Sequence, residues 1–225
     1  MKLIILVGFS KGLGRAMYEQ LLPTLIPGER ELLALGRNIK NNIHHDSVTH
    51  LEADLLRTNC WEKIHIPKKT KSIDVIFNAA VIEPIGTVGA IESDQIESAV
   101  KVNYIAPMIL VNTLIDQQKK SNFVLKLNNI TSGASSKAIE GWALYCSTKA
   151  AFKMFLDVVR LESVKNVSIS HINPGLIDTD MQKVIRSKTE KEMKNVHNFI
   201  NLKKSNSLKS PYQVGKNVLE EAGLI

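Results

Sequence analysis

The 225-residue sequence contains few cysteines, few aromatic residues and no long apolar run. Its two cysteines, Cys60 and Cys146, are too few for a disulfide framework, which argues against a small secreted scaffold. No apolar stretch approaches the length that crosses a bilayer, and the apolar start of the chain is too short for a signal peptide. We therefore expect a cytoplasmic protein without a membrane partner.

Aromatic residues make up only 5% of the chain, so side chains that stack on nucleic-acid bases are scarce. The formal net charge of +7 favours acidic partners in general, but the cations do not form a tight block. The six histidines show no spacing typical of metal ligands. These features predict neither a nucleic-acid partner nor a metal site.

Hydrophobic residues make up 44% of the chain, which is enough for a sizeable core at this length. Neither an internal repeat, nor a low-complexity tract, nor a linker divides the sequence. We therefore expect a single domain over residues 1–225.

Short apolar runs alternate with helical patterns along the chain, which is typical of a parallel sheet covered on both faces. Several of these runs are apolar throughout, as expected for strands buried on both sides. The expected strands are Lys2 to Val7, Glu31 to Leu35, Val48 to Ala53, Ile73 to Phe77, Phe123 to Ile130 and Val167 to Ile172. Long helical patterns cover Ser93 to Gln118 and Trp142 to Val164. The prediction is an α/β fold, a Rossmann-type doubly wound sheet whose strands end at one edge.

A glycine-rich turn follows the first expected strand and opens a helical pattern. Gly8 allows the tight turn, Gly12 lets the backbone approach a pyrophosphate, and Gly14 lets the helix pack close to the strand. The helix N-terminus then faces anionic oxygens. The turn residues expected to bind a dinucleotide are Gly8, Ser10, Lys11, Gly12, Leu13 and Gly14.

Tyr145 and Lys149 are four residues apart, so on a helix their side chains share one face. A neighbouring ammonium lowers the pKa of a phenol, because it stabilises the phenolate. Ser132 ends another apolar run, and its hydroxyl is placed to point at the same spot. The three residues predict a proton donor for a polarised carbonyl. The alternative is a chance pairing of a half-buried tyrosine with a solvated lysine.

These motifs, together with the Asn78-Ala79-Ala80 sequence after a strand, resemble the short-chain dehydrogenase/reductase family over roughly residues 1 to 182. Within that family, Gly141 to Lys149 and Pro174 to Gln182 resemble sepiapterin reductases and the bacterial reductases of benzil-type diketones. The resemblance implies an NADP-binding fold and a carbonyl reductase.

The resemblance also implies further site residues. Lys149 would hold the nicotinamide ribose, and Asn103 would help to hold a water chain to that lysine. The other cofactor contacts implied are Asp54, Leu55, Asn78, Ala79, Ala80, Tyr145, Pro174, Gly175 and Thr179. Each polar residue has a structural alternative: a turn or cap acid for Asp54, a turn-former for Asn78, a helix cap for Thr179 and an interior amide for Asn103.

Charge near the second expected strand bears on the choice of cofactor. Arg37 lies just past this strand, where many dinucleotide-binding folds carry an acid, and Lys11 lies in the glycine-rich turn. Two cations there suit the extra phosphate of NADP, so we expect NADPH to be preferred over NADH. The alternative is a pair of solvated surface cations.

The sequence departs from the family pattern near the cofactor and at its end. Val7, Phe77 and Ala80 replace residues that are common in the family. The last family strand is apparently missing, and with it the acid that anchors the pterin in sepiapterin reductase. A less polar ketone or diketone is therefore the expected substrate. Residues 182–210 are rich in lysine and are expected to cover the substrate.

The predicted function is an NADPH-dependent carbonyl reductase in which Ser132 and Tyr145 hydrogen-bond the reacting oxygen and Tyr145 gives up its proton. Two alternatives stay open: a reductase of 3-oxoacyl groups on an acidic carrier, and a non-enzymatic sensor that binds NADP. A homodimer formed through the two long helices is expected from the resemblance.

Overall fold

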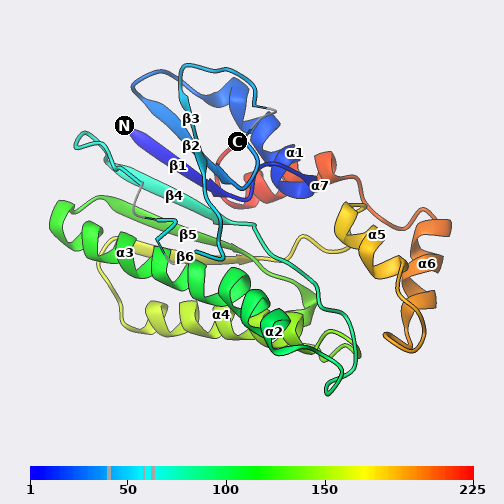
Figure 1. Ribbon diagram of the computed structural model, residues 1–225. Coiled ribbons are helices and arrows are strands. Elements are labelled where there is room, and N and C mark those ends of the chain that lie inside the picture. Colours follow the sequence, from blue (N-terminus) through cyan, green and yellow to red (C-terminus); the bar gives the residue numbers. More distant parts are fainter. Residues whose placement is uncertain (40–41, 58, 62–63) are drawn as a thin grey trace.

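The computed structural model describes residues 1–39, 42–57, 59–61 and 64–225. A six-stranded parallel sheet of order β3-β2-β1-β4-β5-β6 lies between two layers of helices (Figure 1). The strands are β1 Lys2–Val7, β2 Arg30–Gly36, β3 Val48–Glu52, β4 Ser72–Phe77, β5 Val124–Ile130 and β6 Val167–Ile172. The strand order reverses between β1 and β4, and a crevice forms at the carboxyl ends of such a pair.

Alternating side chains of β1 enter two separate cores. Ile5 and Val7 pack in the cluster beneath α3 Ala106–Ser121 and α4 Ala143–Leu161. Ile4 and Leu6 pack in the cluster beneath α1 Gly12–Leu21 and α7 Pro211–Glu221. Because a strand points successive side chains to opposite faces, an apolar run throughout is what two covered faces require.

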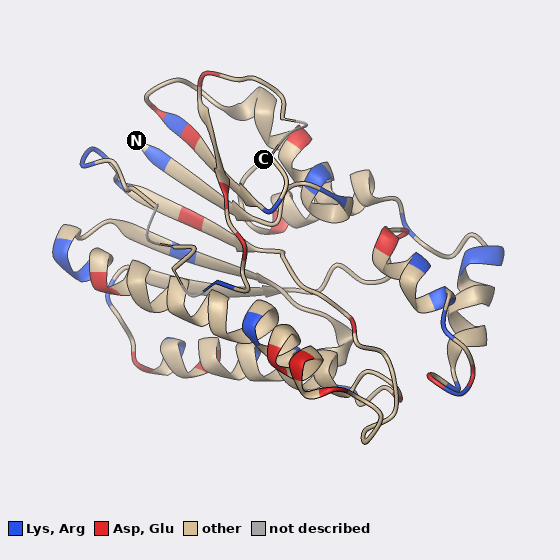
Figure 2. Cartoon of the chain, in the orientation of Figure 1, with Lys and Arg blue, Asp and Glu red and all other residues tan. Residues whose placement is uncertain are grey.

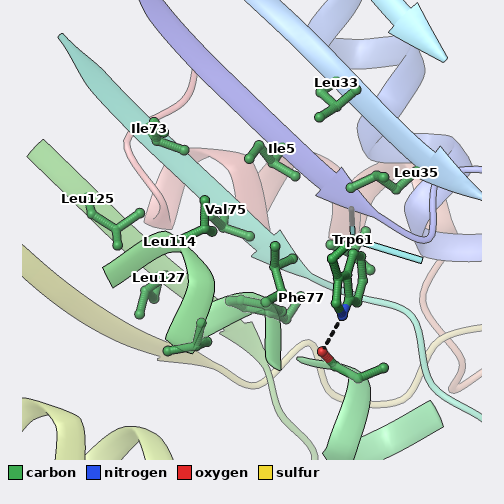
Figure 3. Close-up of a cluster of buried hydrophobic side chains, with 14 of the residues drawn as sticks. Ile5, Leu33, Leu35, Trp61, Ile73, Val75, Phe77, Leu114, Leu125 and Leu127 are labelled. Atoms are coloured by element: carbon green, nitrogen blue, oxygen red, sulfur yellow. Dashed lines mark hydrogen bonds between the residues drawn. The ribbon is translucent and has the colours of Figure 1, made fainter. Parts of the chain in front are cut away.

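Figure 3 shows the first of these clusters, in which Ile5, Val75 and Leu127 extend from neighbouring strands toward Trp61 and Leu114. The dashed line marks the hydrogen bond that Trp61 Nε1 donates to the carbonyl of Ala106, at 2.8 Å. The loop after β3 is thereby tied to the start of α3.

The sequence prediction of the sheet is confirmed, with each strand boundary within one residue of the expected position. The helix predicted over Ser93 to Gln118 is continuous, but it contains a π-helical turn that the sequence did not predict. It consists of α2 Ser93–Val100, a π-helical turn η2 Lys101–Ile105 and α3. The helix predicted over Trp142 to Val164 ends earlier, at Leu161, and Ser163 adopts a left-handed backbone conformation just beyond it.

The remaining helices lie after β6. Helices α5 Asp180–Arg186 and α6 Val196–Lys204 extend beyond the carboxyl edge of the sheet, at the right of Figure 1. Helix α7 returns to pack beside α1. The short 3₁₀ turns are η1 Leu22–Thr24 and η3 Gly133–Ser135.

By length and composition alone, one helical segment among the described residues, Ser93–Ser121, contains a stretch apolar enough to cross a membrane. The prediction of no membrane-spanning stretch applies to uninterrupted apolar runs, and polar residues such as Asn103 and Asn112 interrupt the one in this helix. Leu110, Val111 and Leu114 of this segment are buried in the core against the sheet. The inner face of this helix therefore belongs to the layer that covers the sheet.

Candidate active site

A cleft of about 1010 Å³ opens along the carboxyl edge of the sheet. It is lined by the loops after β1, β2, β3, β4, β5 and β6, together with the start of α4 and residues of α2 and α5. Of the residues predicted from the sequence to form the site, all but Gly14 and Asn103 line this cleft. Those that do are Gly8, Ser10, Lys11, Gly12, Leu13, Arg37, Asp54, Leu55, Asn78, Ala79, Ala80, Ser132, Tyr145, Lys149, Pro174, Gly175 and Thr179.

The glycine-rich turn is packed too tightly for side chains. Gly8 and Gly12 have φ angles of 89° and 53°, which favour glycine. A Cβ at Gly8 would lie 2.8 Å from Ala79, and a Cβ at Gly14 would lie 1.8 Å from the carbonyl oxygen of Gly8. Asn78 Nδ2 donates to that same oxygen at 2.7 Å. Asn78 thus fixes the conformation of the turn and also lines the cleft. It can serve both as a turn-former and as the expected cofactor contact.

Helix α1 begins at this turn without a side-chain cap, because Lys11 at the N-cap makes no capping hydrogen bond. The first residues of the helix lie at the cleft, and the glycines of the turn leave its backbone uncovered at Gly8 and Gly12, while the bulky Phe9 is buried in the core. These features fit the pyrophosphate of a dinucleotide. The residues present therefore suit a nicotinamide dinucleotide.

Ser132 lies just after β5, and its hydroxyl reaches Tyr145 on α4. Ser132 Oγ accepts a hydrogen bond from the backbone N–H of Ala134 at 3.2 Å, which fixes its direction. The Ser132 hydroxyl lies close enough to the Tyr145 hydroxyl to act on it, and this neighbour acts to lower the pKa of the phenol. Two hydroxyl groups thus meet at one point of the cleft wall.

The pKa of Tyr145 is raised in this structure, and not lowered as its place beside Lys149 led us to expect. Burial outweighs the effect of the Ser132 hydroxyl and raises the pKa of Tyr145 to about 12. Lys149 is itself buried, and its Nζ lies 5.8 Å from the centroid of the tyrosine ring. Its ammonium donates to the carbonyl of Ile130 at 2.9 Å, and burial lowers its pKa to about 8. A solvated surface lysine is thereby excluded.

Asn103 lies in the π-helical turn η2 and acts as a tie between elements. Its Oδ1 accepts from the backbone N–H of Val81 at 2.8 Å, and its Nδ2 donates to the Val81 carbonyl at 2.8 Å and to Thr148 Oγ1 at 3.2 Å. The side chain is therefore a satisfied interior amide that links the loop after β4 to α4. It lines a small cavity of about 10 Å³ that Lys149 also lines.

A cluster of buried apolar side chains, part of which lines one end of the cleft, was not predicted from the sequence, and we call it the apolar chamber. Trp142 lies edge-on to Tyr145, with ring centroids 5.8 Å apart, and also packs on Phe199 at 5.3 Å. The buried members of this cluster are Ile82, Ile85, Ala134, Trp142, Tyr145, Ile185 and Met193. Trp142 lies one helical turn before Tyr145, and this spacing was the available signal.

Helix α5 and the segment after it are tied to the loops on either side of the chamber. Lys188 lies 3.6 Å from Glu83, and Lys194 lies 3.3 Å from Glu140. A Cβ at Gly141 would lie 2.7 Å from the carbonyl oxygen of Glu192. Figure 2 shows basic and acidic residues on α5 and α6. Lys183 pairs with Asp180, and Lys203 pairs with Asp178. Much of the positive charge of this segment is therefore compensated locally.

Comparisons with known proteins agree with this geometry. The sequence profile of the short chain dehydrogenase family matches residues 2–190. Benzil reductase ((S)-benzoin forming) of Bacillus cereus is 35% identical over 235 residues, covering 98% of this chain and 94% of the relative. Sepiapterin reductase of Xenopus laevis is 24% identical over 205 residues, covering 83% and 78%. The crystal structure of KRED1-Pglu enzyme matches with a TM-score of 0.84 at 26% identity, covering 100% of this chain and 94% of that one.

Proposed function

The chain belongs to the short chain dehydrogenase family, and from this premise we propose that it is an NADPH-dependent reductase of ketones and diketones. The observation that carries the proposal is the meeting of the Ser132 and Tyr145 hydroxyl groups beside the buried ammonium of Lys149. A non-enzymatic sensor would need only the cofactor half of the cleft, so this constellation favours an enzyme.

The protonation states of the pair favour reduction. With a pKa raised to about 12, Tyr145 is a neutral phenol at pH 7 and is therefore a proton donor. A bound reduced nicotinamide supplies the hydride that converts the carbonyl to an alkoxide. Ser132 and Tyr145 then donate hydrogen bonds to the oxygen as its negative charge develops, and Tyr145 transfers its proton to it.

Lys149 compensates the charge left on Tyr145. Its pKa of about 8 leaves it mostly protonated at pH 7, and its position 5.8 Å from the ring lets it stabilise the phenolate that proton transfer produces. In the family, this lysine also holds the nicotinamide ribose. Asn103 positions Lys149 indirectly. Its side chain links Thr148, the residue before Lys149 on α4, to Val81 in the loop after β4.

The apolar chamber supports an apolar ketone as the substrate. Ile82, Trp142 and Ile185 of the apolar cluster line the cleft together with Tyr145. Bacillus cereus benzil reductase, a relative at 35% identity, is named for a diketone with two phenyl rings. We infer that the chain reduces aromatic ketones or diketones and that residues 182–210 cover the bound substrate.

The first test follows NADPH oxidation by absorbance with a panel of benzil, simple aromatic ketones, sepiapterin and a 3-oxoacyl thioester on its carrier. We expect benzil to be reduced. Tyr145→Phe should lower turnover by at least about a hundredfold, because the general acid is lost, while NADPH still binds. Near-normal turnover in this variant would contradict the assigned role, and preference for the carrier-bound thioester would favour the 3-oxoacyl alternative.

Arg37 and Lys11 carry the proposed preference for NADPH. Both are exposed at the end of the cleft that the loops after β1 and β2 form. Each charge-assisted contact to a phosphate contributes about 1.5 to 3 kcal/mol when well formed. Screening by solvent reduces that value at exposed sites, so we expect NADPH to be preferred by about tenfold to a thousandfold.

The double variant Lys11→Gln/Arg37→Gln should lose this preference, measured as the ratio of kcat/KM for NADPH and for NADH. Arg57→Gln is the matched control, because its side chain is 79% exposed and Arg57 does not line the cleft. We expect the control to keep the wild-type ratio. An unchanged ratio in the double variant would show that the cofactor phosphate is held elsewhere.

A further inference from the structure

Two polar atoms at the substrate end of the cleft are buried without a hydrogen-bond partner among the described residues. They are Nε1 of Trp142 and Oε1 of Gln182. Both side chains are 6% exposed, and both residues line the cleft. Buried polar groups in folded proteins are nearly always hydrogen-bonded, so an indole N–H and an amide oxygen left unpaired along one cleft call for an explanation.

The other tryptophan of the chain shows how the fold treats an indole outside the cleft. Trp61 Nε1 donates to the carbonyl of Ala106 at 2.8 Å within the core cluster of Figure 3. Other unpaired buried atoms, such as Asp74 Oδ1 and Asn128 Nδ2, belong to strand residues that do not line the cleft. Trp142 and Gln182 are distinguished because both line the cleft, and Trp142 also contacts Tyr145.

The position of Trp142 sets what its N–H can contact. The indole lies edge-on to Tyr145 at 5.8 Å between ring centroids, and the Tyr145 hydroxyl lies near that of Ser132. Trp142 therefore lines the cleft beside the Ser132 and Tyr145 pair at which a carbonyl would bind. Gln182 adds an acceptor from α5, next to Met181 of the same apolar cluster.

We propose that Trp142 and Gln182 select ketones that carry a second oxygen on the carbon next to the reacting carbonyl; this inference rests on the proposed reductase function. The indole N–H donates to the second oxygen of a 1,2-diketone. In a 2-hydroxyketone, the hydroxyl accepts from Trp142 and donates to Gln182 Oε1. A ketone without the second oxygen leaves both groups unpaired, and polar sites discriminate against such analogues.

The test compares benzil with 1,2-diphenylethanone, which has the same carbon skeleton but a methylene group in place of one carbonyl. We expect the wild type to prefer benzil by at least about tenfold in kcat/KM. Trp142→Phe should reduce kcat/KM for benzil by about tenfold to a hundredfold and change that for 1,2-diphenylethanone by less than about threefold. Gln182→Leu should reduce kcat/KM for benzoin, a 2-hydroxyketone, more than that for 1,2-diphenylethanone.

Phe199→Leu is the matched control for packing, because Phe199 contacts the Trp142 ring but has no hydrogen-bonding group. Loss of packing alone should change kcat/KM for the diketone and the monoketone by the same factor. A melting temperature within a few degrees of the wild type would establish that Trp142→Phe is folded.

Reduction of both ketones by Trp142→Phe with the wild-type ratio would overturn the proposal and would indicate that a water molecule satisfies the indole. If the wild type reduces neither ketone, the proposed function fails, and calorimetric dissociation constants of the two ketones for the NADPH-loaded protein decide the inference. A benzil preference that Trp142→Phe abolishes would support it, and equal wild-type affinities would overturn it.

Discussion

Lys149 stands out at the scale of single residues, because it is a cation placed in the protein interior. It has one hydrogen bond, to the carbonyl of Ile130, and burial lowers its pKa from 10.5 to about 8. Removing a charge from water costs free energy that a single carbonyl does not return in full. The residue that stabilises the proposed phenolate therefore weakens the fold at neutral pH.

Replacing Lys149 by methionine should stabilise the protein at pH 7. The folded pKa lies below the unfolded one, so the unfolded chain binds more protons between pH 8 and 10.5, and wild-type stability rises with pH through that window. Below pH 8 the full cost of the buried charge applies. We expect Lys149→Met to gain about 1 to 3 kcal/mol in free energy of unfolding at pH 7, and less of a gain near pH 10.

Urea unfolding at pH 7 and pH 10 measures this gain, together with the loss of ketone reduction in the same variant. The exposed Lys204 provides the control, because Lys204→Met removes a lysine charge without a change in burial. Lower stability of Lys149→Met than of the wild type at pH 7 would show that the contacts of the ammonium outweigh its desolvation.

Site residues that directly follow a strand were predictable from the sequence. Site residues that reach the cleft only through the packing of helices were not. Asn78 and Ser132 follow strands, so their place at the sheet edge follows from topology alone. Trp142 and Gln182 lie within apolar or basic patterns that have ordinary structural readings. The direction of the Tyr145 pKa was wrong because burial is a tertiary property that neighbouring residues in the sequence do not reveal.

At the scale of elements, the contact between Gly141 and Glu192 joins the loop before α4 to the segment after α5. Gly141→Ala places a Cβ within 2.7 Å of the Glu192 carbonyl oxygen and strains a φ of 80°. We expect the segment to shift and KM for the ketone to rise by about tenfold, a difference of about 1.4 kcal/mol, with the NADPH dissociation constant unchanged.

Steady-state kinetics and cofactor titration distinguish these effects. Gly89→Ala is the matched control, because Gly89 also has a positive φ, of 99°, but an added Cβ would meet nothing within 4 Å. We expect it to retain the wild-type KM. Equal changes in both variants would attribute the effect to backbone strain and not to the covering segment.

Prediction succeeded best for the strands, because an apolar run such as Lys2–Val7 has few alternatives when turn residues limit it. The short helices α5 and α6 were not predicted, because the lysine-rich residues 182–210 were treated as one covering segment. The π-helical turn η2 has no local sequence signal, since its extra residue is fixed by the contacts of Asn103 with Val81 and Thr148.

At the scale of the whole molecule, α4 carries an apolar stripe on its outer face. Met154, Val158 and Leu161 are 63%, 46% and 82% exposed, at a spacing that places them along one side of the helix. Clustered apolar side chains on a surface mark contact sites, and identical chains commonly pair through a two-fold axis. We propose a homodimer in which α4 and α3 contact their counterparts.

The variant Val158→Glu/Leu161→Glu should convert this dimer to a monomer, because each interface would receive charges on both sides of the axis. Light scattering coupled to size exclusion measures the mass. Val88→Glu is the control, because Val88 is 79% exposed in the loop between β4 and α2. A monomeric wild type, or a dimer that persists in the double variant, would contradict the proposed interface.

The π-helical turn η2 has a consequence for how the long helix tolerates change. Each residue advances an α-helix by about 100°, so the extra residue of a π turn resets the rotational phase of everything beyond it. Asp94 and Ser98 of α2 line the cleft, whereas Leu110 and Leu114 of α3 face the sheet. Substitutions within this helix act on one half at a time, but a single-residue deletion at the turn would rotate one half away from its surface. We therefore expect the helix to tolerate point substitutions better than insertions or deletions.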